Sequence, residues 1–297
     1  MKDRPTPPVL WTRGDGCSEL AGLLGDATVR VVGDLADACV ATRAELMVGR
    51  KLPGEFDLVN FAVPVDFAPT NVKAVAAAVG GGPHSALAAW VAGRLARTLG
   101  VPGVMASAYA DAAGQGSALA IIERLAPEVP ELEYRAVEAA DMTALVRRLP
   151  DRALLVFGAP GGNWFQRLVF GPGARLRHRA PAGAVVVRQV PERVFQHMRE
   201  PVYVGPWRQV GDTLLMHQEP ALAVVEEGVL IGLVRRAALL DAGHAESVGS
   251  IMEEPLAVDR LEALSAADSL RVVYEEAPIP VVDQHHRMLG SLYPTAA

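Results

Sequence analysis

The chain has 297 residues, of which 51% are hydrophobic and only 5% aromatic, with 34 acidic against 28 basic side chains. This length predicts about two domains, and an apolar content dominated by Ala, Val and Leu favours packed α/β layers. The net charge of −6 and the presence of only three lysines argue against a nucleic-acid partner.

Cysteine usage and the amino terminus point to a reducing compartment. Cys17 and Cys39 give neither a disulfide framework nor a metal-ligand spacing, so no metal is predicted. The first residues, MKDRPTPPVLW, lack the charged-then-apolar order of a signal peptide. No stretch approaches the roughly 18 apolar residues that indicate a membrane span. We therefore expect a cytoplasmic protein with no transmembrane segment.

Residues 1–70 show short apolar runs that alternate with helical patterns, which is typical of parallel α/β structure. The expected elements are a strand at 8–11, a helix at 17–24, a strand at 29–32, a helix at 35–47 and a further apolar run at 57–65. The pattern leaves open whether this region is a domain of its own or an extension of the next sheet.

The alternation of strands and helices is clearer in residues 71–190. The expected strands are 72–79, 104–109, 133–137, 154–157 and 184–187, and the expected helices are 85–99, 117–125, 142–149 and 174–179. Leucine and valine at four-residue spacing support the helix at 85–99, which Gly100 ends. Together these elements predict a doubly wound, five-stranded parallel sheet.

Glycines gather in the stretch from Leu154 to Arg188, between the end of one strand and the start of a helix. Their positions are Gly158, Gly161, Gly162, Gly171 and Gly173. Glycines at such a place let backbone N–H groups approach phosphate oxygens, and the helix dipole adds to the attraction. The stretch is therefore a candidate phosphate-binding loop.

Residues 191–297 contain two similar segments, about 191–245 and 246–297. Met198 and Pro201 recur as Met252 and Pro255 at the same offset. A strand, a polar turn and a strand ending near Gly232 or near Gly290 follow in each copy, with a helix before them at 211–217 or 261–275. The recurrence predicts a duplicated βαββα unit that pairs with itself.

The glycine stretch resembles the nucleotide-binding members of the universal stress protein family. Their loop carries Gly, two residues, Gly, nine residues, Gly and then Ser or Thr, and Gly158, Gly161 and Gly171 stand at this spacing. The resemblance implies that these glycines cradle the phosphates and ribose of ATP. The chain departs from the family at Pro172, which offers neither a hydroxyl nor an N–H.

Two alignments of the first strand of this resemblance are open. One places Asp66 at the end of that strand, near the adenine. The other, which we prefer, uses the strand at 72–79 and the turn Gly80–Gly82, because it gives a first helix of normal length. The candidate nucleotide contacts implied by the family then include Gly81 and Val104 beside the glycines of the loop.

The repeats resemble a CBS domain pair, a class of module that commonly binds adenosine-containing ligands between its two repeats. The family signature is Gly, two apolar residues, Thr or Ser, two residues and Asp. Arg235 replaces the hydroxyl and Ala238 the carboxylate in the first repeat, and Tyr293 replaces the hydroxyl in the second. Arg235 remains a candidate phosphate contact.

No catalytic constellation stands out, since the chain lacks a Walker loop and a Gly-x-Ser-x-Gly motif. The sequence thus predicts a regulatory protein, not an enzyme, that senses an adenine nucleotide and signals through oligomerisation or a protein partner. The resemblances imply a homodimer, through the CBS pair and the last strand at 184–187. The alternatives are a structural or accessory subunit whose nucleotide pockets are degenerate and empty, and a weak ATPase.

Overall fold

The computed structural model describes residues 7–50, 57–140, 142–159, 180 and 182–294. The chain divides into two compact units, residues 1–190 (unit 1) and 191–297 (unit 2), and each is described by itself. Over the described residues, no helix is long and apolar enough to cross a membrane.

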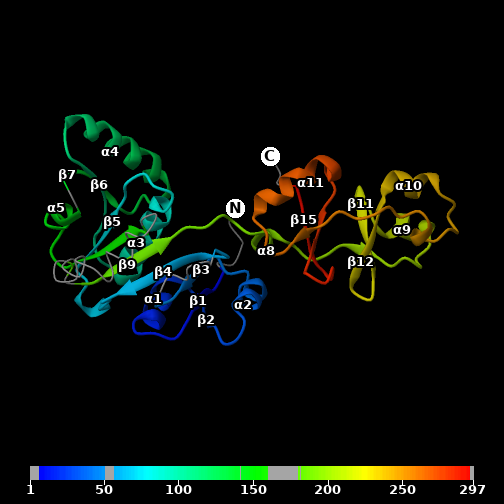
Figure 1. The fold of residues 1–297 in the computed structure, drawn as a ribbon, viewed down its shortest axis with the longest axis horizontal. Coiled ribbons are helices and arrows are strands. Elements are labelled where there is room, and N and C mark those ends of the chain that lie inside the picture. Colours follow the sequence, from blue (N-terminus) through cyan, green and yellow to red (C-terminus); the bar gives the residue numbers. More distant parts are fainter. Residues whose placement is uncertain (1–6, 51–56, 141, 160–179, 181, 295–297) are drawn as a thin grey trace. The chain divides into compact units, whose positions relative to one another are not determined.

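Unit 1 is built on one nine-stranded sheet, with the strand order β2-β1-β3-β4-β9-β8-β5-β6-β7 (Figure 1). The strands are β1 (Val9–Trp11), β2 (Thr28–Arg30), β3 (Leu46–Val48), β4 (Asn60–Val65), β5 (Ala74–Ala78), β6 (Gly103–Tyr109), β7 (Glu133–Glu138), β8 (Ala153–Gly158) and β9 (Ala184–Arg188). The five parallel strands predicted for residues 71–190 are present as β5 to β9. Four further strands extend the sheet, so the predicted size of five is wrong.

Strands β1 to β4, all within the first 65 residues, belong to the same sheet, which answers the question that the sequence leaves open. Strands β1 to β4 are parallel to one another, and β4 pairs antiparallel with β9, with Val63 opposite Val186. The sheet therefore consists of two parallel halves that run in opposite directions. Because β9 lies between β4 and β8, it has no free edge, and the predicted homodimer contact through this strand is wrong.

The described helices of unit 1 are α1 (Cys17–Leu24), α2 (Leu35–Thr42), α3 (Ser85–Leu99), α4 (Ala112–Leu125) and α5 (Met142–Val146). Helix α3 packs against β5, β8 and β6, and α1 packs against α3. Helix α3 buries Leu87, Val91 and Leu95, and each such side chain contributes roughly 1.5–3 kcal/mol to stability when fully buried. Gly100 ends the helix in the left-handed region, with a φ of 66°.

Three predicted helix boundaries in unit 1 are wrong. The helix expected at 142–149 ends at Val146. The helix expected at 35–47 ends at Thr42, because Arg43 adopts a φ of 52° and its N–H bonds the carbonyl of Cys39. Residues 46–48 then form β3. The helix expected at 117–125 begins at Ala112, because the Asp111 carboxylate accepts the N–H of Gly114 and caps it. Residues 112–116, which precede the expected helix, therefore lie inside α4.

Unit 2 contains two three-stranded sheets of the same design. The first joins β10 (Tyr203–Val204), β11 (Ala221–Glu226) and β12 (Val229–Arg235), and the second joins β13 (Val258–Asp259), β14 (Ile279–Val282) and β15 (Met288–Leu292). Each sheet has one parallel and one antiparallel pair, and each antiparallel pair has one register shift at a Val-Val step. The helices are α8 (Val194–His197), α9 (Val210–Met216), α10 (Arg236–Asp241) and α11 (Ala267–Tyr274).

The two Met-x-x-Pro segments of unit 2, residues 198–201 and 252–255, are exchanged: each pairs with the sheet of the other repeat. Arg199 pairs with Ser291 of the second sheet, and Glu253 pairs with Leu233 of the first. Each methionine packs on the glycine of the strand that its segment joins. A Cβ added to Gly232 would lie 2.5 Å from the Met252 sulfur, and one added to Gly290 would lie 3.1 Å from the Met198 Cβ. This exchange explains why methionine and glycine recur together and why neither repeat is complete alone.

Candidate functional sites

The carboxyl ends of β5 and β8 form the first candidate site, in unit 1. The strand order places β6 and β7 on one side of β5, and β8 and β9 on the other. The chain therefore leaves β5 and β8 in opposite directions, so the strand order reverses between the two strand ends. In open α/β sheets, ligands bind at such a reversal of strand order.

The turn Gly80–Gly82, which carries no side chains, follows the end of β5. Gly81 has a φ of 74°, a conformation that side chains with a Cβ rarely adopt, and an added Cβ would lie 3.0 Å from Ile121 Cδ1. The turn leads into α3, which has 15 residues and no side-chain cap at its amino end. The first N–H groups of this helix and its dipole therefore favour an anion at this end.

Gly158 and His84 bring the ends of β8 and β5 together. A Cβ at Gly158 would lie 2.7 Å from His84 Cβ, so only glycine permits this approach. His84 Nδ1 accepts the N–H of Gln189 at 3.1 Å. Burial, and secondarily the positive charge of Arg188, lower the pKa of His84 from its ordinary value of 6.5, which keeps the imidazole neutral at neutral pH.

Ser107, near the end of β6, is a polar residue that sequence reasoning missed. It is 1% exposed, and its hydroxyl has no hydrogen-bond partner among the residues that the structure describes. It follows Ala106, whose carbonyl accepts the N–H of Val79 just beyond β5. The available signal was one hydroxyl within the otherwise apolar run of β6, since buried polar groups without partners are rare in proteins.

The structure places the other residues predicted for this site as follows. Gly161, Gly162, Gly171, Gly173 and Pro172 lie outside the described residues. Val104 is 2% exposed and pairs with Ala76 and Glu133 near the amino end of β6, away from the carboxyl edge. Asp66 follows β4, whose carboxyl end lies beside the amino end of β9. Asp66 therefore lies at the opposite edge of the sheet from the Gly80–Gly82 turn.

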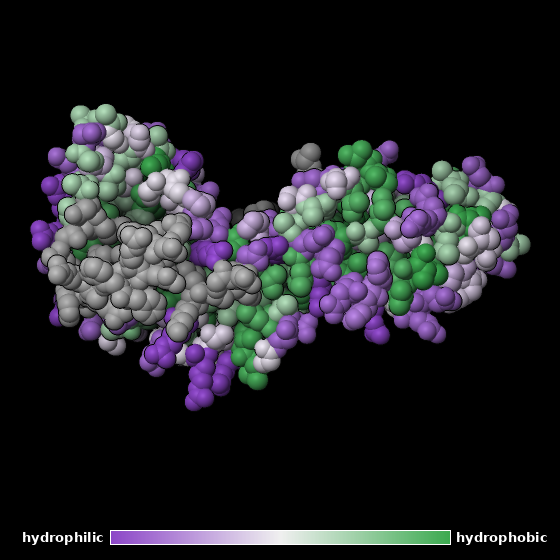
Figure 2. Space-filling view, in the orientation of Figure 1, coloured by the Kyte–Doolittle hydropathy of each residue, from purple (hydrophilic) through white to green (hydrophobic). Residues whose placement is uncertain are grey.

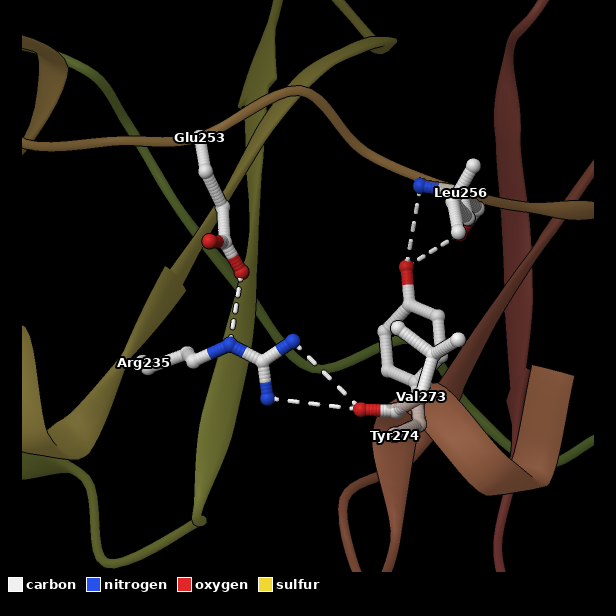
Figure 3. A network of polar contacts seen from close by, with 5 residues as sticks. All are labelled: Arg235, Glu253, Leu256, Val273 and Tyr274. Carbon is white, nitrogen blue, oxygen red and sulfur yellow. Dashed lines mark hydrogen bonds and ion pairs between the residues drawn. The ribbon is translucent and has the colours of Figure 1, made fainter.

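The second candidate site lies in unit 2, where Arg235 stands at the end of β12 (Figure 3). Its Nε donates to the Glu253 carboxylate at 2.7 Å, and its two terminal nitrogens donate to the carbonyl of Val273 at 3.4 Å. Glu253 comes from the exchanged segment and Val273 from α11, so this one side chain joins three segments. The guanidinium predicted to hold a phosphate is therefore engaged within the unit.

Tyr293 stands at the position of the second repeat that corresponds to Arg235. Its ring lies 5.2 Å from the Arg199 guanidinium, and its carbonyl accepts a hydrogen bond from Arg271 at 3.2 Å. Arg199 belongs to the other exchanged segment. At both positions where the CBS signature has a hydroxyl, a large side chain thus contacts the exchanged segment instead.

Tyr274 holds the backbone of Leu256 in place, near Arg235 (Figure 3). It is 2% exposed, and its hydroxyl donates to the Leu256 carbonyl and accepts the Leu256 N–H at 3.1 Å. Burial raises the pKa of this phenol, so it remains a neutral donor. Both hydrogen bonds are made within unit 2, which makes Tyr274 a structural residue.

Unit 2 also carries large apolar side chains on its helices that are open to solvent. Leu215, Leu240 and Val272 are 83%, 64% and 82% exposed, respectively. Figure 2 shows hydrophobic residues over α11, next to hydrophilic ones. In the described part of the chain, no group of three His, Cys, Asp or Glu residues is placed to hold a metal ion.

Comparisons with known proteins match only part of the chain. No family model and no curated protein matches it. A CBS domain pair/ACT domain protein from Thermotoga maritima is 22% identical, with 34% of this chain and 88% of that one covered and a TM-score of 0.32. The CBS-pair protein CBSX2 from Arabidopsis thaliana is 23% identical, with 34% and 87% covered and a TM-score of 0.31.

The soluble part of a magnesium transporter is 17% identical, with a TM-score of 0.32. The similarity covers 34% of this chain and less than half, 44%, of that one. Each of these similarities extends over about a third of the chain. Identities below 25% and TM-scores near 0.3 carry no function across, so functional inference depends on the residues and contacts described above.

Proposed function

We propose that the chain is a non-enzymatic regulatory protein that senses an adenine nucleotide at the carboxyl ends of β5 and β8. The observation that carries this proposal is the reversal of strand order at β5, where a glycine turn leads directly into the uncapped end of α3. Backbone N–H groups at a helix amino end bind phosphate without a cationic side chain.

The resemblance to universal stress proteins supports adenine nucleotides, ATP above all, as the ligand class. Gly158, Gly161 and Gly171 stand at the spacing of that family. Gly158 lies against His84, at the junction of the two strand ends. In this proposal the glycines that follow Gly158 contact the phosphates and the ribose, and Gly81 keeps the turn opposite them open.

Unit 2 is proposed to be a CBS pair that reports the state of unit 1 to a partner or to a second copy of the chain. The support is its own repeat: two sheets with the same pairing, the same register shift and reciprocal Met-on-Gly contacts. The exposed apolar side chains Leu215, Leu240 and Val272 provide the kind of surface through which such association occurs.

Calorimetry of the full chain with ATP, ADP, AMP and cyclic AMP tests the proposal. We expect one of them to bind, and Gly81→Val to weaken that binding at least tenfold, because valine is strained at a φ of 74° and its branched side chain closes the turn. Gly22→Ala in α1 is the matched control, since an added Cβ there has no neighbour within 4 Å. The absence of heat and of any melting shift with all four nucleotides would refute the proposal.

The second candidate function is a structural or accessory subunit whose nucleotide pockets stay empty. The contacts of Arg235 with Glu253 and of Tyr293 with Arg199 favour it for unit 2, because both signature positions serve to join the repeats. Mass spectrometry of the protein purified from its native source separates the two functions. Co-purification of a stable protein partner without any nucleotide supports the second candidate, and a co-purifying nucleotide counts against it.

A further inference from the structure

Two hydrogen bonds hold the chain at the point where it leaves unit 1. Strand β9 ends at Arg188, and the next two residues are each held by one side chain from elsewhere in the unit. His84 Nδ1 accepts the N–H of Gln189, and Asn60 Oδ1 accepts the N–H of Val190, both at 3.1 Å. The two acceptors come from the turn before α3 and from the start of β4, which are far from residue 189 in the sequence.

Unit 2 begins to hold the chain almost at once. The carbonyl of Glu192 accepts the N–H of Leu264 at 2.7 Å, and Arg193 pairs with Ala263. Between the last anchor in unit 1, at Val190, and the first anchor in unit 2, at Glu192, only Pro191 remains. Proline has a fixed φ and no N–H, so the connection between the anchors is short and stiff.

Loss of the two bonds lengthens this connection. The free segment then runs from the end of β9 to Glu192 and comprises residues 189–191. Two additional free residues add about 7 Å of reach at full extension, since each contributes at most about 3.5 Å. The length of the tether between the units therefore depends on two side chains of unit 1.

We propose that His84 and Asn60 form an exit clasp that sets the length of the tether between the units, and that protonation of His84 opens one half of it. An imidazole accepts a hydrogen bond at Nδ1 only when that nitrogen carries no proton, and a protonated ring would turn a second donor toward the Gln189 N–H. Asn60 does not titrate, so its half of the clasp is independent of pH.

The surroundings of His84 set the pH range of this switch. Its own turn is uncharged, α3 has no acidic residue in its first turn, and the end of β8 at 157–159 is uncharged. Arg188, at the end of β9, is the charged residue that acts on the imidazole among those described, and together with burial it lowers the His84 pKa below 6.5. The stabilisation from neutral His84 is therefore complete above pH 6.5 and is lost as the pH falls through the lowered pKa.

The clasp is distinct from the proposed nucleotide function, although His84 lies at the same strand ends. His84 packs on Gly158, so a ligand at the strand ends would lie near one half of the clasp. The tether prediction needs only a proton as the probe. Failure of nucleotide binding would refute the proposed function and leave the test of the clasp unaffected.

Distance measurements between two spin labels on the full chain test the clasp. Cys17 and Cys39 are 0% exposed, so labels attach to cysteines introduced at exposed positions, Glu123→Cys in unit 1 and Ala245→Cys in unit 2. We compare this parent with His84→Ala, Asn60→Ala and the double variant at pH 7.5 and pH 5.0. Asp111→Ala is the matched control, because Asp111 also precedes a helix but caps only its own helix through Gly114.

We expect the distance distribution of the parent to stay narrow at both pH values, because Asn60 still holds Val190. The distribution of Asn60→Ala should broaden on acidification, because His84 is then the last anchor, and that of the double variant should be broad at both pH values. The Asp111→Ala protein should behave as the parent does. Amide exchange should rise at least tenfold at Gln189 in His84→Ala and at Val190 in Asn60→Ala. If His84→Ala does not fold, acidification of Asn60→Ala decides, because His84 is then the remaining anchor.

Three results would overturn the proposal. The first is a double variant with the same distribution as the parent at pH 7.5. The second is an Asn60→Ala protein whose distribution does not change on acidification. The third is an Asn60→Ala protein that is already as broad at pH 7.5 as the double variant.

Discussion

The strand ends of unit 1 and those of unit 2 use their residues in opposite ways. At the ends of β5 and β8, Gly81 and Gly158 keep the backbone bare, and α3 begins without a side-chain cap. At the ends of β12 and β15, Arg235 and Tyr293 carry large side chains, and these contact the exchanged segments. The difference is that unit 1 leaves bare backbone at its strand ends, whereas in unit 2 the side chains at the strand ends join the two repeats.

This comparison of the two units requires that strands β1 to β4 are an integral part of the sheet that carries the proposed site of unit 1. Val63 in β4 is 3% exposed and faces Val186 across the antiparallel pair. Val63→Asp would bury a carboxylate without a partner, and we expect it to lower the free energy of unfolding of unit 1 by about 3–5 kcal/mol. Urea unfolding of the full chain measures the loss.

Val32→Asp is the matched control for this experiment, because Val32 is 83% exposed. The same exchange at this surface position should change the unfolding free energy by no more than about 0.5 kcal/mol. Equal losses in the two variants would show that β4 is not packed against β9 in solution, and the comparison of the two units would lose its basis.

The contacts that join the two repeats of unit 2 can be tested at Gly232 and Gly290, against which Met252 and Met198 pack. An added Cβ at Gly290 would lie 2.7 Å from the Arg199 carbonyl oxygen, whereas one at Gly232 would meet the flexible Met252 side chain. We expect Gly290→Ala to cost about 1–3 kcal/mol and Gly232→Ala to cost less, because a backbone atom moves less easily than a methionine. Thermal unfolding that ranks the two variants in the reverse order would contradict the exchanged arrangement.

The elements that local sequence signals determine could be predicted. Helix α3 has the predicted bounds, because leucine and valine at four-residue spacing and a terminal Gly100 act over a few residues. The end of α2 could not be predicted, because Arg43, not a glycine, adopts the left-handed conformation there. The start of α4 was hidden by two glycines that Asp111 brings into the helix by capping it.

The features that depend on contacts between distant residues could not be predicted. The apolar runs of β4 and β9 are both recognisable, yet nothing local says that they pair with each other. The repeat, the glycines of the turn and Arg235 were visible in the sequence. The bond between His84 and Gln189 follows from the topology, and the sequence carries no local sign of it.

A smaller effect is expected at the pair of Arg235 and Glu253. Their side chains are 40% and 50% exposed, so a double-mutant cycle of Arg235→Ala and Glu253→Ala should give a coupling of about 0.2–1 kcal/mol. The pair of Arg135 and Glu133 in β7 has similar exposure and lies within one strand, which makes it the matched control.

Arg235→Ala should also leave nucleotide affinity unchanged within twofold, since its guanidinium is engaged within unit 2. Calorimetry with the nucleotide that binds the parent measures this affinity. A tenfold loss of affinity in Arg235→Ala would place the ligand in unit 2 and reverse the comparison.

The most direct test of the central claim is a titration of the isotopically labelled full chain with ATP, followed by nuclear magnetic resonance. We predict that the amide signals of residues 80–82, 84–85 and 158–159 shift as ATP is added, and that those of residues 232–236 and 290–293 do not. Shifts confined to the unit 2 residues, or no shift in either unit, would contradict the claim that unit 1 carries the nucleotide site.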